Sequence, residues 1–322
     1  MMAPLPGPAP WRVPARVLLA LVLFLGVPAT LARECPGADA TALEWLDKMS
    51  RSNQSVAYHG VVTFQRGDDL QVMQIERRVS GPAGTEQLTR LTGQGAQVLR
   101  ADHPLDCLHP GHKLLQLGDQ LAEGNCGIAK LYRLSVSEGE RVAGRRAVRV
   151  AVEPRDMYRY GYVMELDKQT GLLLKITTIG RGDQVLERFQ FADLTYGDAP
   201  AREPVVELVH RARHPNPHEL SDAPGLGLPW GLGWLPQGFT LTDASTADAA
   251  RRTYTDGLAV FSVFLERLAE EMPSGEGVAR QGSTTSYTRG MQIGDEPVLV
   301  TVIGEVPVNT ARMVADSLSR MR

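Results

Sequence analysis

The stretch Tyr58–Val79, YHGVVTFQRGDDLQVMQIERRV, predicts two β-strands joined by a tight polar turn at Arg66–Asp69. Its first strand contains the run Val61–Phe64, whose β-branched and aromatic residues favour extended backbone. In the return strand, Met73 and Ile75 point to one face and their polar neighbours to the other, which is the period of a half-buried strand. Because the first strand is apolar on both faces, we expect cover on both sides and interpret this hairpin as the start of a long antiparallel sheet.

Further strands separated by turn signals continue this sheet. We expect them at residues 86–91, 97–101, 146–152, 161–167, 172–179 and 185–194. Residues 131–136 fit either a strand or a helix. Lys168–Gly171 and Gly180–Asp183 are hairpin turns, and no crossover helix separates these strands, so the sheet is predicted to be antiparallel. Before the hairpin, Thr41 and Glu44 form a predicted capping box that starts a helix reaching about Ser52.

A second, smaller domain is predicted at the C-terminal end. Residues 33–209 form the large sheet domain, the polar and proline-rich residues 210–227 form a linker, and residues 228–322 form a domain of sheet plus helix. Its strands are expected at 239–243, 253–254, 259–268, 284–292 and 298–302. Asn309 is the predicted cap of a last helix that reaches Met321. The fold class is therefore α+β and mostly antiparallel β.

The N-terminal residues 1–32 have the layout of a secretory signal peptide. Arg12 and Arg16 precede the apolar run Val17–Val27, and small residues follow up to Ala32, where we expect cleavage. An uncleaved anchor is the alternative, but the apolar run is short for a membrane span. Lipid attachment at Cys35 is rejected, because the residues directly before this cysteine are not small. Export would place the protein in the periplasm.

Export also places the three cysteines in an oxidising compartment. Cys107 and Cys126 enclose a loop of moderate length, and we predict that they form a disulfide bond worth about 3 kcal/mol on the chain-entropy model. Cys35 is then the unpaired thiol, although a bond from Cys35 to either of the other two stays open.

Composition and motifs provide no support for catalysis or nucleic-acid binding. The net charge of −3 comes without a basic run, so no nucleic-acid partner is expected. The chain contains no nucleophile elbow, P-loop or zinc-protease motif, so no catalytic residue and no cofactor are predicted. One cluster of candidate metal ligands consists of His103, Cys107, His109 and His112. We interpret it as a polar loop and predict no metal, because a disulfide-bonded cysteine offers no thiolate.

A long sheet with few covering helices can leave an apolar concavity, and this would suit an acyl chain. The candidates to line it are Val62, Phe64, Met73, Ile75, Val98, Leu173 and Ile176. The alternative is that these residues fill an ordinary closed core.

The chain resembles the RseB/MucB family of periplasmic regulators of the envelope-stress (sigma-E type) response. The likeness covers nearly all of the expected mature chain in order. It rests on five segments, which are Ala42–Leu46, Tyr58–Phe64, Leu166–Lys175, Trp234–Phe239 and Tyr254–Phe264. Each segment alone is a weak motif, and the five together are specific.

The resemblance implies a large N-terminal domain similar to the LolA/LolB lipoprotein carriers, an unclosed β-barrel with helices. It also implies a function, which is to bind the periplasmic domain of a membrane anti-sigma factor of the RseA/MucA type and to shield it from the site-1 protease. Lipid A, lipopolysaccharide or another source of acyl chains, such as mislocalised lipoprotein, would trigger release. The candidates for contacting the partner are the aromatic residues Trp230, Trp234, Phe239, Phe261 and Phe264 of the C-terminal domain. A lipid or lipoprotein carrier of the LolA type is the alternative function, and a homo-oligomer stays open.

Overall fold

A computed structural model describes residues 39–80, 83–92, 97–100, 127–198, 208–210, 230–245, 250–268 and 275–320. All of them belong to one compact unit, Cys35–Arg322. The predicted signal peptide, the histidine-containing loop, Cys107, Cys126 and most of the predicted linker lie outside the described residues.

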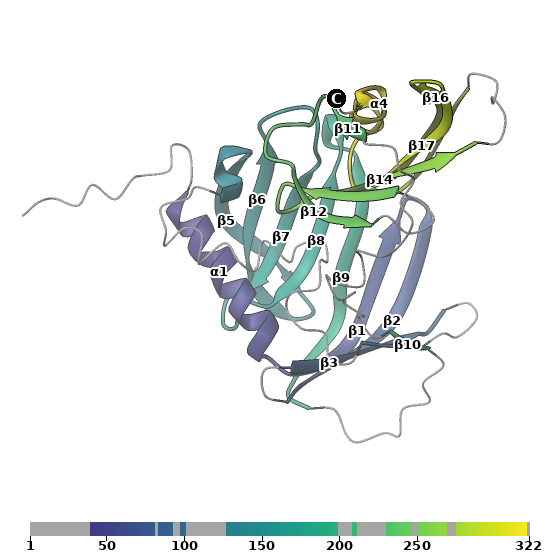
Figure 1. The fold of residues 1–322 in the computed structure, drawn as a ribbon. Coiled ribbons are helices and arrows are strands. Elements are labelled where there is room, and N and C mark those ends of the chain that lie inside the picture. The colour runs from purple at the N-terminus through teal and green to yellow at the C-terminus, as the bar shows by residue number, and fades with distance from the viewer. Residues whose placement is uncertain are drawn as a thin grey trace, which may run out of the picture. The chain divides into compact units, whose positions relative to one another are not determined.

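Among the described residues, the first part of this unit is a ten-stranded sheet accompanied by helix α1 (Ala40–Ser55) (Figure 1). The strands are β1 Tyr58–Arg66, β2 Asp69–Ser80, β3 Ala83–Arg90, β4 Gln97–Arg100, β5 Tyr132–Val142, β6 Arg145–Pro154, β7 Gly161–Asp167, β8 Leu173–Ile179, β9 Val185–Tyr196 and β10 Leu208–His210. Short 3-10 helices occupy Gly127–Lys130 and Arg181–Asp183.

The sheet has the order β10-β4-β3-β2-β1-β9-β8-β7-β6-β5. Every pairing in it is antiparallel except the short parallel contact between β10 and β4. Strands β10 and β5 lie at the two ends of the order, so the sheet is not closed on itself. The prediction of an unclosed, mostly antiparallel sheet is therefore confirmed. The ambiguous residues 131–136 fall almost entirely in β5, a strand.

The β1–β2 hairpin forms as the sequence predicts. Gly67 lies in the turn with a φ of 58°, a left-handed conformation that glycine adopts without steric cost. Val62 lies opposite Met73, and Gly60 lies opposite Ile75. Directly opposed residues share a face of the sheet, so these apolar side chains lie on one side.

Helix α1 begins earlier than the predicted capping box. Its N-cap is Asp39, whose carboxylate accepts hydrogen bonds from the backbone N–H groups of Thr41 and Ala42. The prediction that Thr41 is the cap is wrong, because Asp39 supplies a charged acceptor two residues earlier. The helix also continues to Ser55 rather than ending near Ser52.

The C-terminal part is a separate, smaller sheet domain, whose described residues include helix α4 (Val308–Asp316). Its six-stranded sheet has the order β12-β13-β14-β17-β16-β15. The strands are β12 Thr240–Ser245, β13 Ala250–Thr255, β14 Val260–Arg267, β15 Glu276–Gln281, β16 Thr284–Ile293 and β17 Glu296–Gly304, and a separate pair consists of β11 Trp230–Leu232 and β18 Leu318–Arg320. The edge strand β15 and the pair β11–β18 were not predicted.

The last helix differs from its prediction at both ends. Pro307 is its N-cap rather than Asn309, and the fixed φ of proline suits the start of a helix. The helix ends at Asp316, because the next residues form β18 and pair with β11. The backbone of His210 belongs to β10 of the large sheet, one residue beyond the predicted domain boundary.

Candidate functional site

Register places the seven predicted lipid-lining positions on one face of the ten-stranded sheet, the helix-side face. Val62 lies opposite Met73, and Phe64 lies opposite Phe189, which itself lies opposite Ile176. The same rule extends the face through three further pairs, which are Ile75 with Leu88, Leu88 with the backbone position of Val98, and Leu173 with Leu166. The side chain of Val98 lies outside the described part. Register therefore brings these seven positions to one face, and their role in lining a lipid site stays a prediction.

Helix α1 covers one part of this face, beside β5 (Figure 1). Leu46 and Met49 of α1 are buried in a cluster with Leu134, Val150 and Met164 of β5, β6 and β7. Leu173 and Ile176 are half-buried against the same cluster. They share this face despite being three residues apart, because a β-bulge lies between them.

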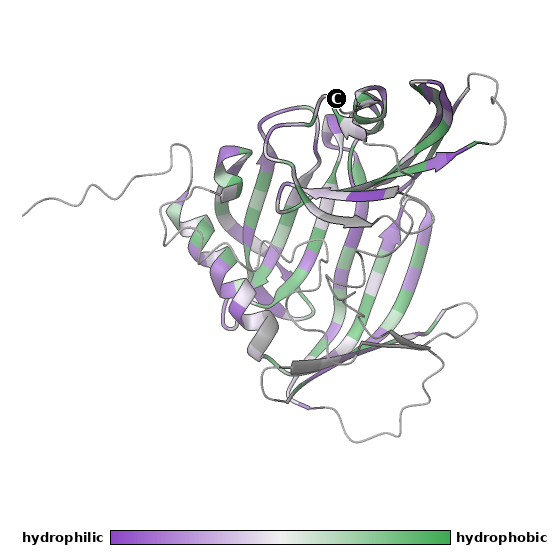
Figure 2. Ribbon diagram, in the orientation of Figure 1, coloured by the Kyte–Doolittle hydropathy of each residue, from purple (hydrophilic) through white to green (hydrophobic). Residues whose placement is uncertain are grey.

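A second cluster occupies the part of the helix-side face formed by β1, β2 and β9. Val62 and Ile75 are buried there with Tyr58 and Phe191, and the rings of Tyr58 and Phe191 meet edge to face at 5.6 Å. Figure 2 shows apolar residues recurring along these neighbouring strands. In this structure Val62 and Ile75 therefore serve as core residues, while Met73 is only half-buried.

Phe64 lies at the edge of this apolar face, next to the charged residues Arg66 and Glu187. Its side chain is half-buried, and the Arg66 guanidinium carbon lies 5.0 Å from the centroid of its ring. Arg66 Nε donates a hydrogen bond to Glu187 Oε1 at 2.8 Å. Of the predicted lining residues whose side chains are described, Val62 and Ile75 are buried, whereas Phe64 retains solvent access next to a polar group.

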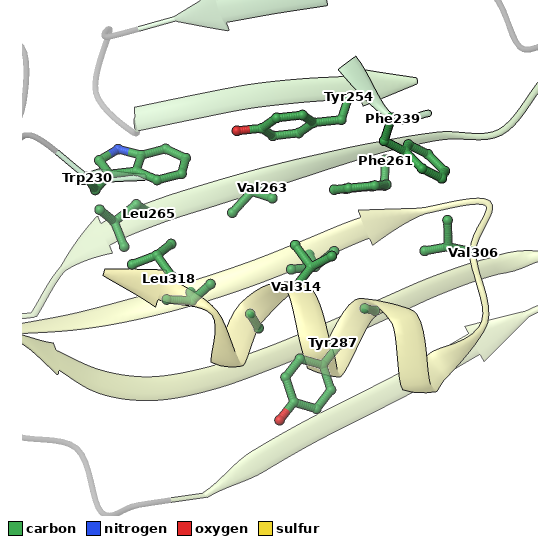
Figure 3. Close-up of a cluster of buried hydrophobic side chains, with 14 of the residues drawn as sticks. Trp230, Phe239, Tyr254, Phe261, Val263, Leu265, Tyr287, Val306, Val314 and Leu318 are labelled. Atoms are coloured by element: carbon green, nitrogen blue, oxygen red, sulfur yellow. The ribbon is translucent and has the colours of Figure 1, made fainter. Parts of the chain in front are cut away.

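The five aromatic residues predicted to contact a partner separate into two groups. Trp230, Phe239 and Phe261 are buried in the core cluster that includes residues of α4. Phe239 and Phe261 meet with ring centroids 5.0 Å apart, whereas Trp230 lies at the other end of the cluster (Figure 3). Trp234 is half-buried and meets Tyr158 edge to face at 5.1 Å. Phe264 is half-buried and lies on the opposite face of the sheet from α4, because its neighbours in sequence, Val263 and Leu265, point into the core.

A buried ion pair joins the two domains. Arg159 follows β6, Asp256 follows β13, and the side chains of both have an exposed fraction of 0%. Arg159 Nη1 donates to Asp256 Oδ2 at 2.6 Å, and the Tyr132 hydroxyl donates to the same oxygen at 2.9 Å. Burial, together with the adjacent Asp256 carboxylate, raises the pKa of Tyr132 well above its ordinary value, so this hydroxyl stays a neutral donor.

The remaining hydrogen-bonding groups of this ion pair are also satisfied. Asp256 Oδ1 accepts from the backbone N–H groups of Leu258 and Ala259, each at 2.8 Å. Arg159 Nη2 donates to the carbonyl of Gln237 at 2.7 Å, and its Nε donates to Asp156 at 3.0 Å. Burial alone would lower the pKa of Arg159, but the carboxylates of Asp156 and Asp256 outweigh burial and raise it. A fully paired buried charge specifies one relative position of the groups that it joins.

Apolar and backbone contacts surround the ion pair. Leu258 of the C-terminal domain is buried in the cluster that contains α1. The Tyr160 hydroxyl donates to the carbonyl of Val306 at 3.2 Å, and Thr310 Oγ1 donates to the carbonyl of Tyr158 at 3.0 Å. The residues between β6 and β7 therefore bind the start of α4 and the turn after β13.

This junction was not predicted from the sequence. The segment that follows Tyr254 carries a turn signal, because an aspartate before glycine commonly accepts hydrogen bonds from the next backbone N–H groups. Nothing in the sequence links Asp256 to Arg159, which lies 97 residues away. Pairing at that separation depends on the tertiary fold.

The described ranges contain neither a candidate metal site nor a candidate membrane-spanning helix. There, no group of three or more histidine, cysteine, aspartate or glutamate residues is arranged to hold a metal ion. In the same ranges, no helix has both the length and the apolar character needed to span a membrane. His103, Cys107, His109 and His112, and the predicted Cys107–Cys126 bond, lie outside these ranges.

The fold and these contacts define a two-domain protein, in which an unclosed sheet with a largely apolar face is joined by a buried ion pair to a smaller sheet domain. Residues 41–209 match the family model of the MucB/RseB N-terminal domain, and residues 227–319 match that of the MucB/RseB C-terminal domain. The chain belongs to the MucB/RseB family.

Individual relatives agree with this assignment. The sigma factor AlgU regulatory protein MucB of Pseudomonas aeruginosa is 36% identical, over 94% of this chain and 96% of the relative. The sigma-E factor regulatory protein RseB of Haemophilus influenzae is 25% identical, over 87% of this chain and 91% of the relative. The structure of the Pseudomonas aeruginosa MucA/MucB complex matches with a TM-score of 0.70 and 32% identity, over 88% of this chain and 99% of the matched chain. The predicted family is therefore confirmed, and the family is one of regulatory proteins.

Proposed function

We propose that this protein is a periplasmic regulator that binds the periplasmic domain of a MucA/RseA-type anti-sigma factor and protects it from the site-1 protease. The observation that carries the proposal is the 36% identity with MucB over 94% of this chain. MucB itself has been crystallised in a complex with MucA. The match includes both domains, so the parts that a MucB-like function requires are present in one chain.

The open face of the C-terminal sheet is our candidate surface for the anti-sigma factor. Phe264 and Ile303 lie on the face opposite α4, since Ile303 pairs with Ser262 and Phe264 follows two residues later. Ile303 is 39% exposed, and Phe264 is half-buried. Accessible apolar residues are the usual anchors of a peptide contact. Trp230, Phe239 and Phe261 would act indirectly, by holding the sheet in shape.

The helix-side face of the large sheet is our candidate for lipid sensing. Phe64 and Met73 are half-buried at the part of the face whose apolar cluster contains no described residue of α1. An acyl chain that binds there would shift the protein toward a state that releases the anti-sigma factor only if it binds that state more tightly. Lipopolysaccharide and mislocalised lipoprotein are the acyl sources that we propose.

A binding and protection assay tests the proposal. The chain without its predicted signal peptide is immobilised and incubated with the periplasmic domain of a MucA-type anti-sigma factor, in the absence and presence of lipopolysaccharide. We expect capture without lipid, loss of capture with lipid, and slower cleavage of the captured domain by a site-1 protease. Absence of capture under both conditions, combined with transfer of acylated ligand to acceptor membranes, would instead support the carrier function.

Periplasmic location follows from the predicted signal peptide. The test is N-terminal sequencing of the chain recovered from a periplasmic extract, with a new terminus expected just after Ala32. Recovery of the intact N-terminus from the membrane fraction would instead support an uncleaved anchor.

A further inference from the structure

A second contact between the domains gathers charged groups at one place. Arg66 and Glu187 lie directly opposite each other on β1 and β9. Glu187 Oε1 accepts from Arg66 Nε at 2.8 Å and from the backbone N–H of Ser283 at 3.2 Å. The Glu187 side chain is only 12% exposed. One carboxylate, fixed by an arginine of its own sheet, therefore binds the turn between β15 and β16 of the C-terminal domain.

The shape of that turn is fitted to this ion pair. Gly282 has a φ of +61°, a conformation that side chains with a Cβ rarely adopt. A Cβ added to Gly282 would lie 2.3 Å from Glu187 Oε1 and 2.5 Å from Arg66 Cγ. The backbone therefore approaches the ion pair as closely as a glycine allows.

Glu305 lies beside this turn on the C-terminal domain. Thr285 pairs with Gly304 in the β16–β17 ladder, which brings Glu305 next to the residues that follow Gly282. Two hydrogen bonds fix the backbone there: Glu305 N–H donates to the carbonyl of Val260 at 2.9 Å, and Thr285 Oγ1 donates to the carbonyl of Val306 at 2.7 Å. The backbone of Glu305 is consequently held beside the start of β16, next to Ser283, whose N–H binds the Glu187 carboxylate.

The carboxyl group of Glu305 has a higher pKa than carboxyl groups usually have. Burial, and next the negative charge of Glu187, raise its pKa to about 7, although Arg66 opposes them. The other titratable and charged groups that face this region are Tyr160 and Tyr162 of the β7 segment and Arg280 of β15. Burial raises the pKa of both tyrosines, so they stay neutral, and arginine stays charged. Glu305 is the member of this set whose charge changes near neutral pH.

We propose that Glu305 is a proton-sensitive latch, which strengthens docking of the β15–β16 turn on the Arg66–Glu187 pair as the surroundings become more acidic. The docked state favours the neutral carboxyl, since the charged form would be half-buried near the charge of a second carboxylate. Separation of the C-terminal domain would remove the Glu187 charge and lower the Glu305 pKa toward its ordinary value of 4.5. Docking is therefore strongest below pH 4.5 and weakens as the pH rises from there to about 7, above which it changes no further.

Hydrogen–deuterium exchange of the purified chain tests this inference without any partner. The readout is the protection factor of the amides around Ser283, corrected for the intrinsic pH dependence of exchange, at pH 5.5 and pH 7.5. The shift of the Glu305 pKa from 4.5 to about 7 corresponds to protection on the order of 10-fold higher at the lower pH. Equal protection at both pH values would overturn the proposal.

Two variants separate the latch from a general effect of pH on stability. Glu305→Gln keeps the shape of the side chain and removes its titration, so we expect high protection at both pH values. Glu296→Gln changes a carboxyl that is 47% exposed at the start of β17, the strand that Glu305 follows, so we expect it to behave like the unmodified chain. Retention of the full pH dependence in Glu305→Gln would assign the effect to another group and would contradict the proposal. These exchange measurements use no anti-sigma factor, so their result does not depend on whether the proposed function is correct.

Discussion

Arg159 and Asp256 form an ion pair 2.6 Å long in which neither side chain is exposed to solvent. The two residues belong to different domains, and every polar atom described for the Asp256 carboxylate has a donor. A buried charge whose partner is removed remains desolvated and unpaired, so the loss of one member is far more damaging than the loss of a surface pair.

Asp256→Ala should therefore lower the free energy of unfolding by about 3–5 kcal/mol, as measured by urea denaturation. Glu153→Ala is the control, because Glu153 and Arg133 form an exposed pair with side chains 61% and 69% exposed, and we expect a change of about 0–1 kcal/mol. The double variant Asp256→Ala/Arg159→Met should lose less free energy of unfolding than the two single variants lose together, because it leaves no unpaired buried charge. A loss below about 1 kcal/mol for Asp256→Ala would show that the pair does not hold the domains together.

Gly282→Ala should destabilise the contact between the C-terminal turn and the Arg66–Glu187 pair. A Cβ at Gly282 meets Glu187 and Arg66, whereas a Cβ at Gly67, whose φ of +58° is nearly the same, meets nothing within 4 Å. In both variants the left-handed backbone should lower the free energy of unfolding by about 1 kcal/mol. Any further loss in Gly282→Ala measures the effect of the close contact with Glu187 and Arg66. Equal losses in urea denaturation would place the turn away from the ion pair.

Asp39→Ala should lower the free energy of unfolding by about 0.5–2 kcal/mol, because it removes the acceptor for two backbone N–H groups of α1. Thr41→Ala should have almost no effect, since the Thr41 side chain is exposed within the first turn. Helix content from circular dichroism and urea denaturation provide the measurements. A larger loss for Thr41→Ala would restore Thr41 as the cap.

Phe64→Asp should weaken the response to lipid by about tenfold or more while leaving anti-sigma binding nearly unchanged, because an acyl chain would be placed against a charge. The control is Gln65→Asp, at the neighbouring exposed position. Titration of the immobilised complex with lipopolysaccharide measures the response. If lipid response and anti-sigma binding fall together, Phe64 is a core residue and the helix-side face is not the sensor.

Local sequence patterns were sufficient for most strands of the large sheet and insufficient for the contacts between the domains. Alternation along Met73 and Ile75 predicts their face, and Lys168–Gly171 predicts a turn, because both signals depend on adjacent residues. The last helix was predicted to continue to Met321, since nothing local reveals that residues beyond Asp316 pair with β11. The docking of Asp256 depends in the same way on a partner brought close only by the complete fold.

The most direct test of the proposed function is titration of this chain, without its predicted signal peptide, with the periplasmic domain of a MucA-type anti-sigma factor. Isothermal titration calorimetry is performed with and without lipopolysaccharide. The account predicts saturable binding without lipid and at least tenfold weaker binding when lipid is present. Absence of binding under both conditions would contradict it.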